Sequence, residues 1–341
     1  MKKKILIVAP HGLGDAIMTC QATAELLQHS ECYFLVGDRV TSNLIKYITN
    51  TPGDKIYILN NNFRLSLFQL SRLWLELFKK RFDGSICQYG VSPAQYALLT
   101  FFLMIRVRVG WIGRLSFLNS LNLAPGNLHK VDATMMMVKA LAAKLKIRLS
   151  NFIPVATGAR NNVKGDIVLG ISSFEDEKHK RWPLSKFSQL CNLIHRDFPG
   201  VKIVIIGSAQ EKEYGDELLR ITGIPDLQNA CGLYSIEESC DRIRNSALVI
   251  ANCNAISHIA GYFNVPTIGL YGPTDPSITG PVSKKLISIR TTSSCAPCYS
   301  PIFSRGCANP TCMDQIHLAN VYQSVLQILI SADSSTKRNT V

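Results

Sequence analysis

The stretch of residues 247–276, ALVIANCNAISHIAGYFNVPTIGLYGPTDP, constrains the fold of this chain more than any other. It predicts a buried strand, a polar turn, a short helix that carries Ser257 and His258, a second buried strand and a turn at residues 272–276. A strand–turn–helix unit offers backbone N–H groups and the positive end of a helix dipole, which suit a phosphate. We therefore expect a nucleotide-diphosphate site at the edge of a parallel sheet.

Composition indicates a folded chain with unevenly distributed charge. The 341 residues suffice for two domains, and 47% apolar with 18% charged residues excludes a disordered protein. Residues 1–150 hold 19 Lys+Arg against 8 Asp+Glu, a balance of +11, whereas residues 151–341 hold 18 against 16, a balance of +2. The basic first part predicts contact with an anionic partner, for which nucleic acid, an anionic lipid surface and a phosphorylated acceptor stay open.

The sequence contains no stretch typical of an export signal or a membrane span. The run Ile5–Ala9 after Lys2–Lys4 is too short for a signal peptide, and residues 12–15 interrupt it. Residues 96–105 fall well short of the roughly 20 that a spanning helix needs. Eleven cysteines without an export signal favour reduced thiols in a cytoplasmic protein.

Short apolar runs alternate with helix-like segments in two series. In the first series, a strand at residues 4–10 precedes a helix pattern, and the alternation continues to about residue 148. Residues 150–163 lack periodicity and are predicted to link it to a second series. We expect domains at residues 1–150 and 164–314, with the working cleft between them. A helix at residues 315–331 is expected to pack back toward the first domain.

The loop His11-Gly12-Leu13-Gly14-Asp15 joins the first predicted strand to the first helix. Glycines allow close approach of the backbone to a ligand, and Asp15 either faces the cleft or caps the helix. The spacing is not the dinucleotide motif G-x-G-x-x-G, because Ile17 stands at its last position. His11 is a further candidate contact for a ligand at this loop.

The segment Ser172-Ser173, followed by Lys180-Arg181-Trp182-Pro183, is a second candidate phosphate site. Hydroxyls directly after a strand can donate to phosphate oxygens, and the cations Lys180 and Arg181 can neutralise a diphosphate. The alternative is a solvated loop of mixed charge ahead of a helix.

The joint order of these pieces resembles glycosyltransferase family 9, the heptosyltransferase family. The motifs are GLGDA, S-S-x6-K-R-W-P, S-H, GPTDP and C-x2-C…C-x4-C-M, and they span nearly the whole chain. The resemblance implies an α/β GT-B fold, with two Rossmann-like doubly wound domains facing a central cleft. It also implies inverting, metal-independent transfer from a nucleotide sugar, with the inner core of lipopolysaccharide as the usual acceptor, an ADP-sugar as the favoured donor and no further cofactor.

The resemblance also assigns roles by position. Asp15 matches the general base, and Ser172, Ser173 and Lys180 match contacts to the donor phosphates. Ser257 and His258 match the helix start beside the pyrophosphate. The donor pocket is closed by a turn of four residues: Gly272, Pro273, Thr274 and Asp275.

One departure from the family pattern concerns the donor sugar. Where relatives carry an aspartate and then, two positions on, a glycine, this chain has Cys253 and Ala255. A thiol is a poor acceptor compared with a carboxylate. Three explanations stay open: another donor sugar, a compensating contact from Asn254, or binding without transfer. A nucleotide-sugar epimerase on the same fold is a further alternative.

Two other features carry predictions about metal and acceptor. Cys295, Cys298, Cys307 and Cys312 have near-metal spacing, so a structural zinc is an alternative to an unmetallated cysteine loop. Basic residues of the first part, among them Arg64, Arg106 and Arg108, are candidates for the acceptor, together with Gly12 and Gly14. They favour an anionic glycolipid and peripheral contact with the inner face of the inner membrane over nucleic acid, for which no motif is present.

Overall fold

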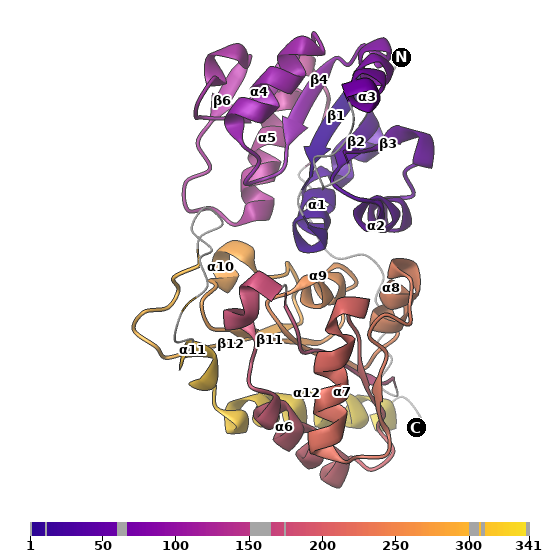
Figure 1. Cartoon of the computed structure of the whole chain (residues 1–341), viewed down its shortest axis with the longest axis vertical. Coiled ribbons are helices and arrows are strands. Elements are labelled where there is room, and N and C mark those ends of the chain that lie inside the picture. The colour runs from indigo at the N-terminus through magenta and orange to yellow at the C-terminus, as the bar shows by residue number, and fades with distance from the viewer. Residues whose placement is uncertain are drawn as a thin grey trace. The chain divides into compact units, whose positions relative to one another are not determined.

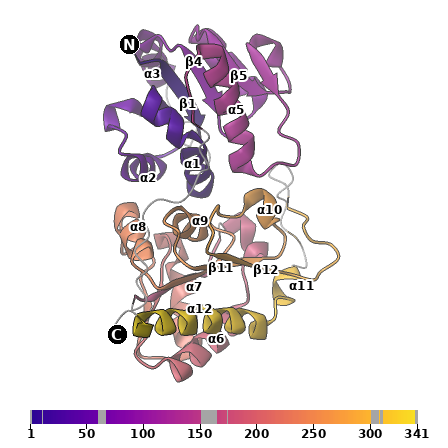
Figure 2. The ribbon, with the colours of Figure 1, turned by 180° about the vertical axis from the view of Figure 1, so that it is seen from behind.

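A computed structural model describes residues 2–10, 12–59, 67–150, 165–173, 175–299, 307 and 311–338. The chain divides into two compact units, Met1–Pro154 and Val155–Val341, each with its own sheet (Figures 1 and 2). None of the helices in the described ranges is both long enough and apolar enough to cross a membrane.

The first unit is a six-stranded parallel sheet with the strand order β3-β2-β1-β4-β5-β6. Its strands are β1 (Lys4–Ala9), β2 (Glu31–Val36), β3 (Ile56–Ile58), β4 (Gly84–Cys87), β5 (Val107–Trp111) and β6 (Leu121–Leu123). Its helices are α1 (Leu13–His29), α2 (Arg39–Thr49), α3 (Leu67–Lys80), α4 (Pro93–Phe102) and α5 (Lys130–Leu145), with 3-10 turns η1 (Gly53–Lys55) and η2 (Ser116–Leu118). Strand β1 is apolar on both faces, as a central parallel strand covered by helices must be.

The second unit repeats this topology with the order β12-β11-β10-β7-β8-β9. Its strands are β7 (Ile167–Gly170), β8 (Ile203–Ile205), β9 (Leu227–Asn229), β10 (Leu248–Asn252), β11 (Thr267–Tyr271) and β12 (Leu286–Arg290). Its helices are α6 (Leu184–Asp197), α7 (Lys212–Thr222), α8 (Ile236–Arg244), α9 (Ala255–Tyr262), α10 (Pro276–Thr279), α11 (Thr311–Asp314) and α12 (Leu318–Arg338), with 3-10 turns η3 (Glu175–Lys180) and η4 (Ala209–Glu211). Counted within each unit, both sheets have the Rossmann order 3-2-1-4-5-6.

The long helix α12 packs on α6 and on strands β11 and β12 of the second sheet, of which β12 is the edge strand (Figure 2). Its side chains Val321, Val325 and Leu329 belong to the core of that unit, together with Trp182 and Phe187. The apolar face of α12 is thus buried in the core of the second unit.

Candidate functional site

Each sheet has one position where the strand order reverses. This switch point lies between β1 and β4 in the first unit and between β7 and β10 in the second. Ligands of open α/β sheets bind outside the carboxyl ends of the strands at such points. Asp15 follows β1, while Ser172 and Asn254 follow β7 and β10, so these candidates occupy the switch points of their own sheets.

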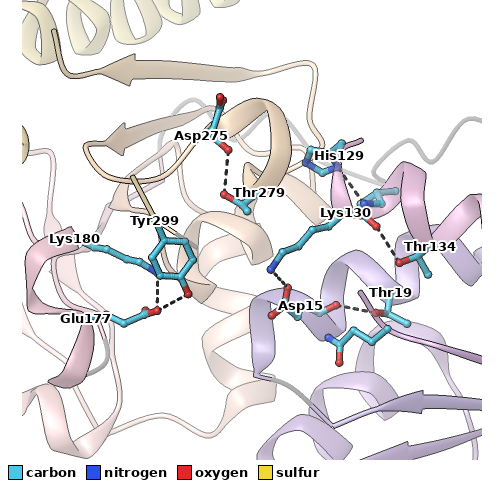
Figure 3. Close-up of polar contacts among 12 residues, drawn as sticks. Asp15, Thr19, His129, Lys130, Thr134, Glu177, Lys180, Asp275, Thr279 and Tyr299 are labelled. Carbon is cyan, nitrogen blue, oxygen red and sulfur yellow. Dashed lines mark hydrogen bonds and ion pairs between the residues drawn. The ribbon is translucent and has the colours of Figure 1, made fainter. Parts of the chain in front are cut away.

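Asp15 lies in the first turn of α1 and does not cap it. The N-cap residue is Gly12, which makes no side-chain cap, and Gly14 lies within the helix. The Asp15 Oδ1 atom forms an ion pair with Lys130 Nζ at 2.7 Å (Figure 3). Side-chain exposure is 26% for Asp15 and 11% for Lys130, so solvent screens the pair only partly. The capping interpretation is therefore wrong, and a cation from the start of α5 holds the carboxylate in place.

Lys180 is buried, which rules out the solvated-loop interpretation of its segment. Its Nζ atom lies 2.7 Å from Glu177 Oε1, and its side chain is 7% exposed. The Tyr299 hydroxyl donates to the same Glu177 oxygen at 2.8 Å, and Lys180 Nζ lies 3.6 Å from the centre of the Tyr299 ring (Figure 3). A cation over an aromatic face is stabilised most where water is excluded. Glu177 and Tyr299 therefore hold the Lys180 ammonium between them.

His179 lies beside this cluster and is also buried. Burial lowers its pKa below the ordinary value, and the neighbouring Lys180 charge acts in the same direction. The imidazole is therefore neutral at neutral pH.

Ser173 and Arg181 form a second polar group after β7. The Ser173 hydroxyl accepts from Arg181 Nε at 3.2 Å and donates to the Glu177 carbonyl at 2.8 Å. Arg181 Nη2 donates to the Ser173 carbonyl at 2.7 Å, and its guanidinium stacks 4.9 Å from the Tyr214 ring centre. Arg181 thus braces the loop that carries Ser172 and Ser173, both of which are buried.

Asn254 fixes the turn between β10 and α9. Its Oδ1 atom accepts from the Ile256 and Ser257 backbone N–H groups at 3.1 and 3.3 Å. Its Nδ2 atom donates to the Gly170 and Ser172 carbonyls, both at 2.9 Å. Two N–H groups that we expected to be open to a phosphate are therefore capped, because an asparagine N-cap accepts from the N2 and N3 amides. The same contacts fill the side chain's hydrogen-bonding capacity, which argues against a compensating contact to the sugar.

The neighbours of Asn254 differ in their access to a ligand. Ser257 is fully buried, and its hydroxyl donates to the Asn254 carbonyl at 2.7 Å, so it is used inside the helix turn. His258 is buried, while Cys253 and Ala255 are half-buried. Burial raises the pKa of Tyr271 well above its ordinary value, and Cys253 acts in the same direction.

The turn after β11 forms backbone hydrogen bonds with the cysteine loop. A Cβ atom at Gly272 would lie 2.5 Å from Met313 Sδ, so any larger residue there would have to displace the Met313 side chain. The Pro273 carbonyl accepts from the Cys298 and Tyr299 amides at 2.9 Å each, which brings Tyr299 to Lys180. Thr274 is buried. Although burial raises the pKa of Asp275, hydrogen bonds from Ser277 and the charge of Arg290 bring it below its ordinary value, so Asp275 caps α10 as a carboxylate.

The remaining predictions concern metal and acceptor. In the part of the chain that the structure describes, no group of three or more His, Cys, Asp or Glu side chains is arranged to hold a metal ion, and the zinc alternative lacks support there. His11 and Arg64 lie outside the described residues. Arg106 is exposed, whereas Arg108 Nε donates to the Leu118 carbonyl at 2.8 Å and so braces η2.

Three residues that contact the candidates within their own units escaped sequence reasoning: Lys130, Glu177 and Tyr299. Lys130 lies 115 positions from Asp15, and Tyr299 lies 122 positions from Glu177. Nothing in their local sequence indicates the contact, since the topology alone brings them together.

Comparisons with known proteins identify the family of this chain. The profile of glycosyltransferase family 9 (heptosyltransferase) matches residues 71–308, more than half of the chain. Lipooligosaccharide heptosyltransferase 2 of Haemophilus influenzae is 27% identical, over 84% of this chain and 88% of the relative. Lipopolysaccharide heptosyltransferase 2 of Salmonella typhimurium is 25% identical, with the same coverage of both chains.

Solved structures show the same GT-B fold. The structure of Escherichia coli ADP-heptose lipopolysaccharide heptosyltransferase II aligns with a TM-score of 0.72 at 19% identity, covering 97% of this chain and 99% of that one. An Escherichia coli heptosyltransferase solved with ADP aligns with a TM-score of 0.74 at 18% identity, covering 95% and 99%. From the family match and the two Rossmann-like units, we conclude that the chain belongs to glycosyltransferase family 9 and is a glycosyltransferase.

Proposed function

We propose that this enzyme transfers a heptose or a related sugar from an ADP-linked donor to the inner core of a lipopolysaccharide. Family membership and the names of the relatives support the donor and acceptor classes. The observation that supports the proposed mechanism is the placement of two charged side chains. A fixed carboxylate, Asp15, follows β1 at the switch point of the first sheet, and a buried ammonium, Lys180, ends the 3-10 turn η3 that follows β7 in the second unit.

Asp15 is proposed to act as general base. The attacking acceptor hydroxyl must lose its proton as it bonds to the anomeric carbon, and a positioned carboxylate takes that proton. The ion pair uses Oδ1, so the proton goes to Oδ2. Attack opposite the departing diphosphate inverts the anomeric configuration in one displacement.

Lys180 is proposed to bind the donor diphosphate. An ammonium has three N–H donors, and the Glu177 contact uses one of them. The others can reach phosphate oxygens and stabilise the negative charge that develops on the leaving group. The proposal assigns this charge stabilisation to Lys180, and it needs no divalent metal.

We further propose that the protein works in the cytoplasm and meets its glycolipid acceptor at the membrane surface. The first 150 residues, with a charge balance of +11, would face the anionic acceptor.

The test is a transfer assay with ADP-heptose and a heptose-deficient lipopolysaccharide core, in which the product is identified by mass and its anomeric configuration by NMR. Asp15→Asn should lower kcat at least a hundredfold with donor affinity kept, because base catalysis contributes about 10²–10⁴-fold. Lys180→Gln should weaken ADP binding. The exposed Asp54→Asn and Lys178→Gln are matched controls that should change neither value.

Three results would contradict the proposal. Donor binding without transfer by the wild-type protein would favour the binding-only alternative. Turnover of the donor without acceptor, to a product that stays nucleotide-linked, would favour an epimerase. Loss of transfer on addition of EDTA, with recovery on adding a divalent cation, would overturn metal independence.

A further inference from the structure

The outer flank of α4 is unusually apolar for an exposed surface. Three of its side chains stand out: Phe102 is 60% exposed, Met104 76% and Phe117 78%. The α4 flank is the set of exposed apolar residues on α4, the following loop, the end of β5 and η2: Leu98, Phe101, Phe102, Met104, Ile112 and Phe117. Contiguous exposed apolar surface of this kind marks an interaction site more often than chance.

Contacts within the first unit join these residues into one surface. Helix α4 packs against η2, which carries Phe117 (Figure 1 shows α4 near the β6 end of the sheet). A Cβ atom at Gly113 would lie 2.7 Å from Pro93 Cγ, so the loop with Ile112 lies against the start of α4. The Arg108 guanidinium lies 5.8 Å from the Phe101 ring centre and bonds to the Leu118 carbonyl, which links the helix end to η2.

The charge of the flank identifies the kind of partner. No aspartate or glutamate occurs between Asp83 and Asp132, while Arg106, Arg108 and Arg114 fall in that interval. Arg106 and Arg114 are exposed at the rim of the flank. Apolar side chains that can enter an acyl layer, with arginines beside them and no acid near, complement an anionic lipid surface. Long arginine side chains also reach headgroup phosphates while their stems stay in the apolar layer.

The flank reaches the edge of the sheet that carries the candidate base. Because parallel strands end at the same edge, Ile112 after β5 lies on the edge where Asp15 follows β1. A glycolipid could therefore keep its acyl chains in the bilayer while its sugar reaches toward this edge.

We infer that the α4 flank docks the first unit on an anionic lipid bilayer, with Phe102, Met104 and Phe117 inserted and Arg106 and Arg114 at the headgroups. The inference deepens the proposed function, since it rests on a glycolipid acceptor. It adds the exposed apolar side chains of α4 and η2 to the basic residues of the first part that the sequence predicted for the acceptor, among them Arg106.

The test is co-sedimentation of the full-length protein with vesicles of phosphatidylethanolamine and phosphatidylglycerol, and with vesicles of pure phosphatidylcholine. The wild type should bind the anionic vesicles and lose binding as salt is raised. The double variant Phe102→Ser, Phe117→Ser should bind about a hundredfold more weakly or worse, because each of the two buried phenyl rings contributes about tenfold or more. Arg106→Gln with Arg114→Gln should weaken binding by roughly twenty-fivefold, on the order of fivefold for each arginine.

Matched variants on α3 provide the control. Leu70 and Leu75 are also exposed, at 43% and 47%, and Arg72 is exposed beside them. Leu70→Ser with Leu75→Ser, and Arg72→Gln, should leave vesicle binding unchanged. Loss of binding in the α3 variants, with the α4-flank variants unaffected, would overturn the inference.

A second readout separates this inference from the proposed function. Transfer to a soluble, delipidated core oligosaccharide should be unchanged in the Phe102→Ser, Phe117→Ser variant. If the wild type transfers to that acceptor yet binds no vesicle, only the docking inference falls; if it transfers to no acceptor, the proposed function falls. A dimer that becomes monomeric in the Phe102→Ser, Phe117→Ser variant, without vesicle binding, would assign the flank to a second copy of the chain and overturn the inference.

Discussion

Asn254 gives the sharpest quantitative prediction, because its side chain makes four hydrogen bonds that different substitutions remove in different combinations. Two of them cap α9, and two tie the turn to carbonyls at the end of β7. Asn254→Ala removes all four. Asn254→Ser keeps a hydroxyl that can cap the helix but cannot reach the carbonyls.

The expected magnitudes follow from these contacts. Loss of an N-cap costs about 1 kcal/mol. Each buried carbonyl left without its donor costs about 1–2 kcal/mol, at the lower part of the range for such groups. Asn254→Ala should therefore lower the free energy of unfolding of the second unit by about 3–5 kcal/mol, and Asn254→Ser by about 2–4 kcal/mol. The gap of about 1 kcal/mol between the variants measures the cap.

The assay is urea unfolding followed by tryptophan fluorescence. Trp182 is fully buried in the second unit, and its indole N–H donates to the Ile316 carbonyl at 3.1 Å. The other two tryptophans, Trp74 and Trp111, belong to the first unit, so a background with both changed to phenylalanine lets Trp182 report on the second unit alone.

An exposed asparagine of the same unit serves as control. Asn192→Ala on α6 should change the free energy of unfolding by no more than about 0.5 kcal/mol, as surface substitutions do. The reasoning would be refuted if Asn254→Ala stayed within about 1 kcal/mol of the wild type, or if the serine variant were less stable than the alanine variant.

Three further predictions address the donor side of the site. Tyr299→Phe removes the hydroxyl bonded to Glu177 but keeps the ring over Lys180, so ADP affinity measured by calorimetry should fall only about fivefold. Tyr299→Leu should lower ADP affinity further, because the cation–π contact with Lys180 is also lost. Equal losses in the two variants would contradict separate roles for the hydroxyl and the ring. Cys253→Asp restores a carboxylate acceptor, so kcat/KM for ADP-heptose should rise about tenfold relative to other ADP-sugars, and an unchanged ratio would argue against a sugar contact at this position. The lowered pKa of His179 means that the unfolded state binds more protons below about pH 6.5, so the free energy of unfolding should fall as pH drops through that value. His179→Gln should flatten this dependence in urea unfolding series, and an unaltered slope would show that another group is responsible.

Strong local patterns in the sequence predicted most of the central elements. The buried runs at β1, β7, β10 and β11 were recognised because a central parallel strand is apolar on both faces. Strands β6, β9 and β12 were missed, because they lie at sheet edges and lack a continuous buried run. Helix α8 was also missed, although Ser235 and Glu238 form a capping box that the sequence S-I-E-E displays.

The residues of the site divide in the same way. Asp15, Lys180 and Asn254 were found because they directly follow predicted strands or belong to an ordered set of motifs. Their environments were not predictable, since burial and long-range contacts depend on the packing of distant segments. Lys180 looked like part of a solvated charged loop and is buried against Tyr299.

The sequence by itself determined the α/β class, the two-unit plan and the family, because these depend on local periodicity and on the order of short motifs. The tertiary structure decided which groups remain available for chemistry. It paired Asp15 with Lys130 and held Lys180 between Glu177 and Tyr299. It also used the Asn254 side chain in hydrogen bonds that fix its own turn. The physical reason is that a polar side chain that becomes buried needs hydrogen-bond or ion-pair partners, and the topology of the sheet determines which groups lie close enough to serve.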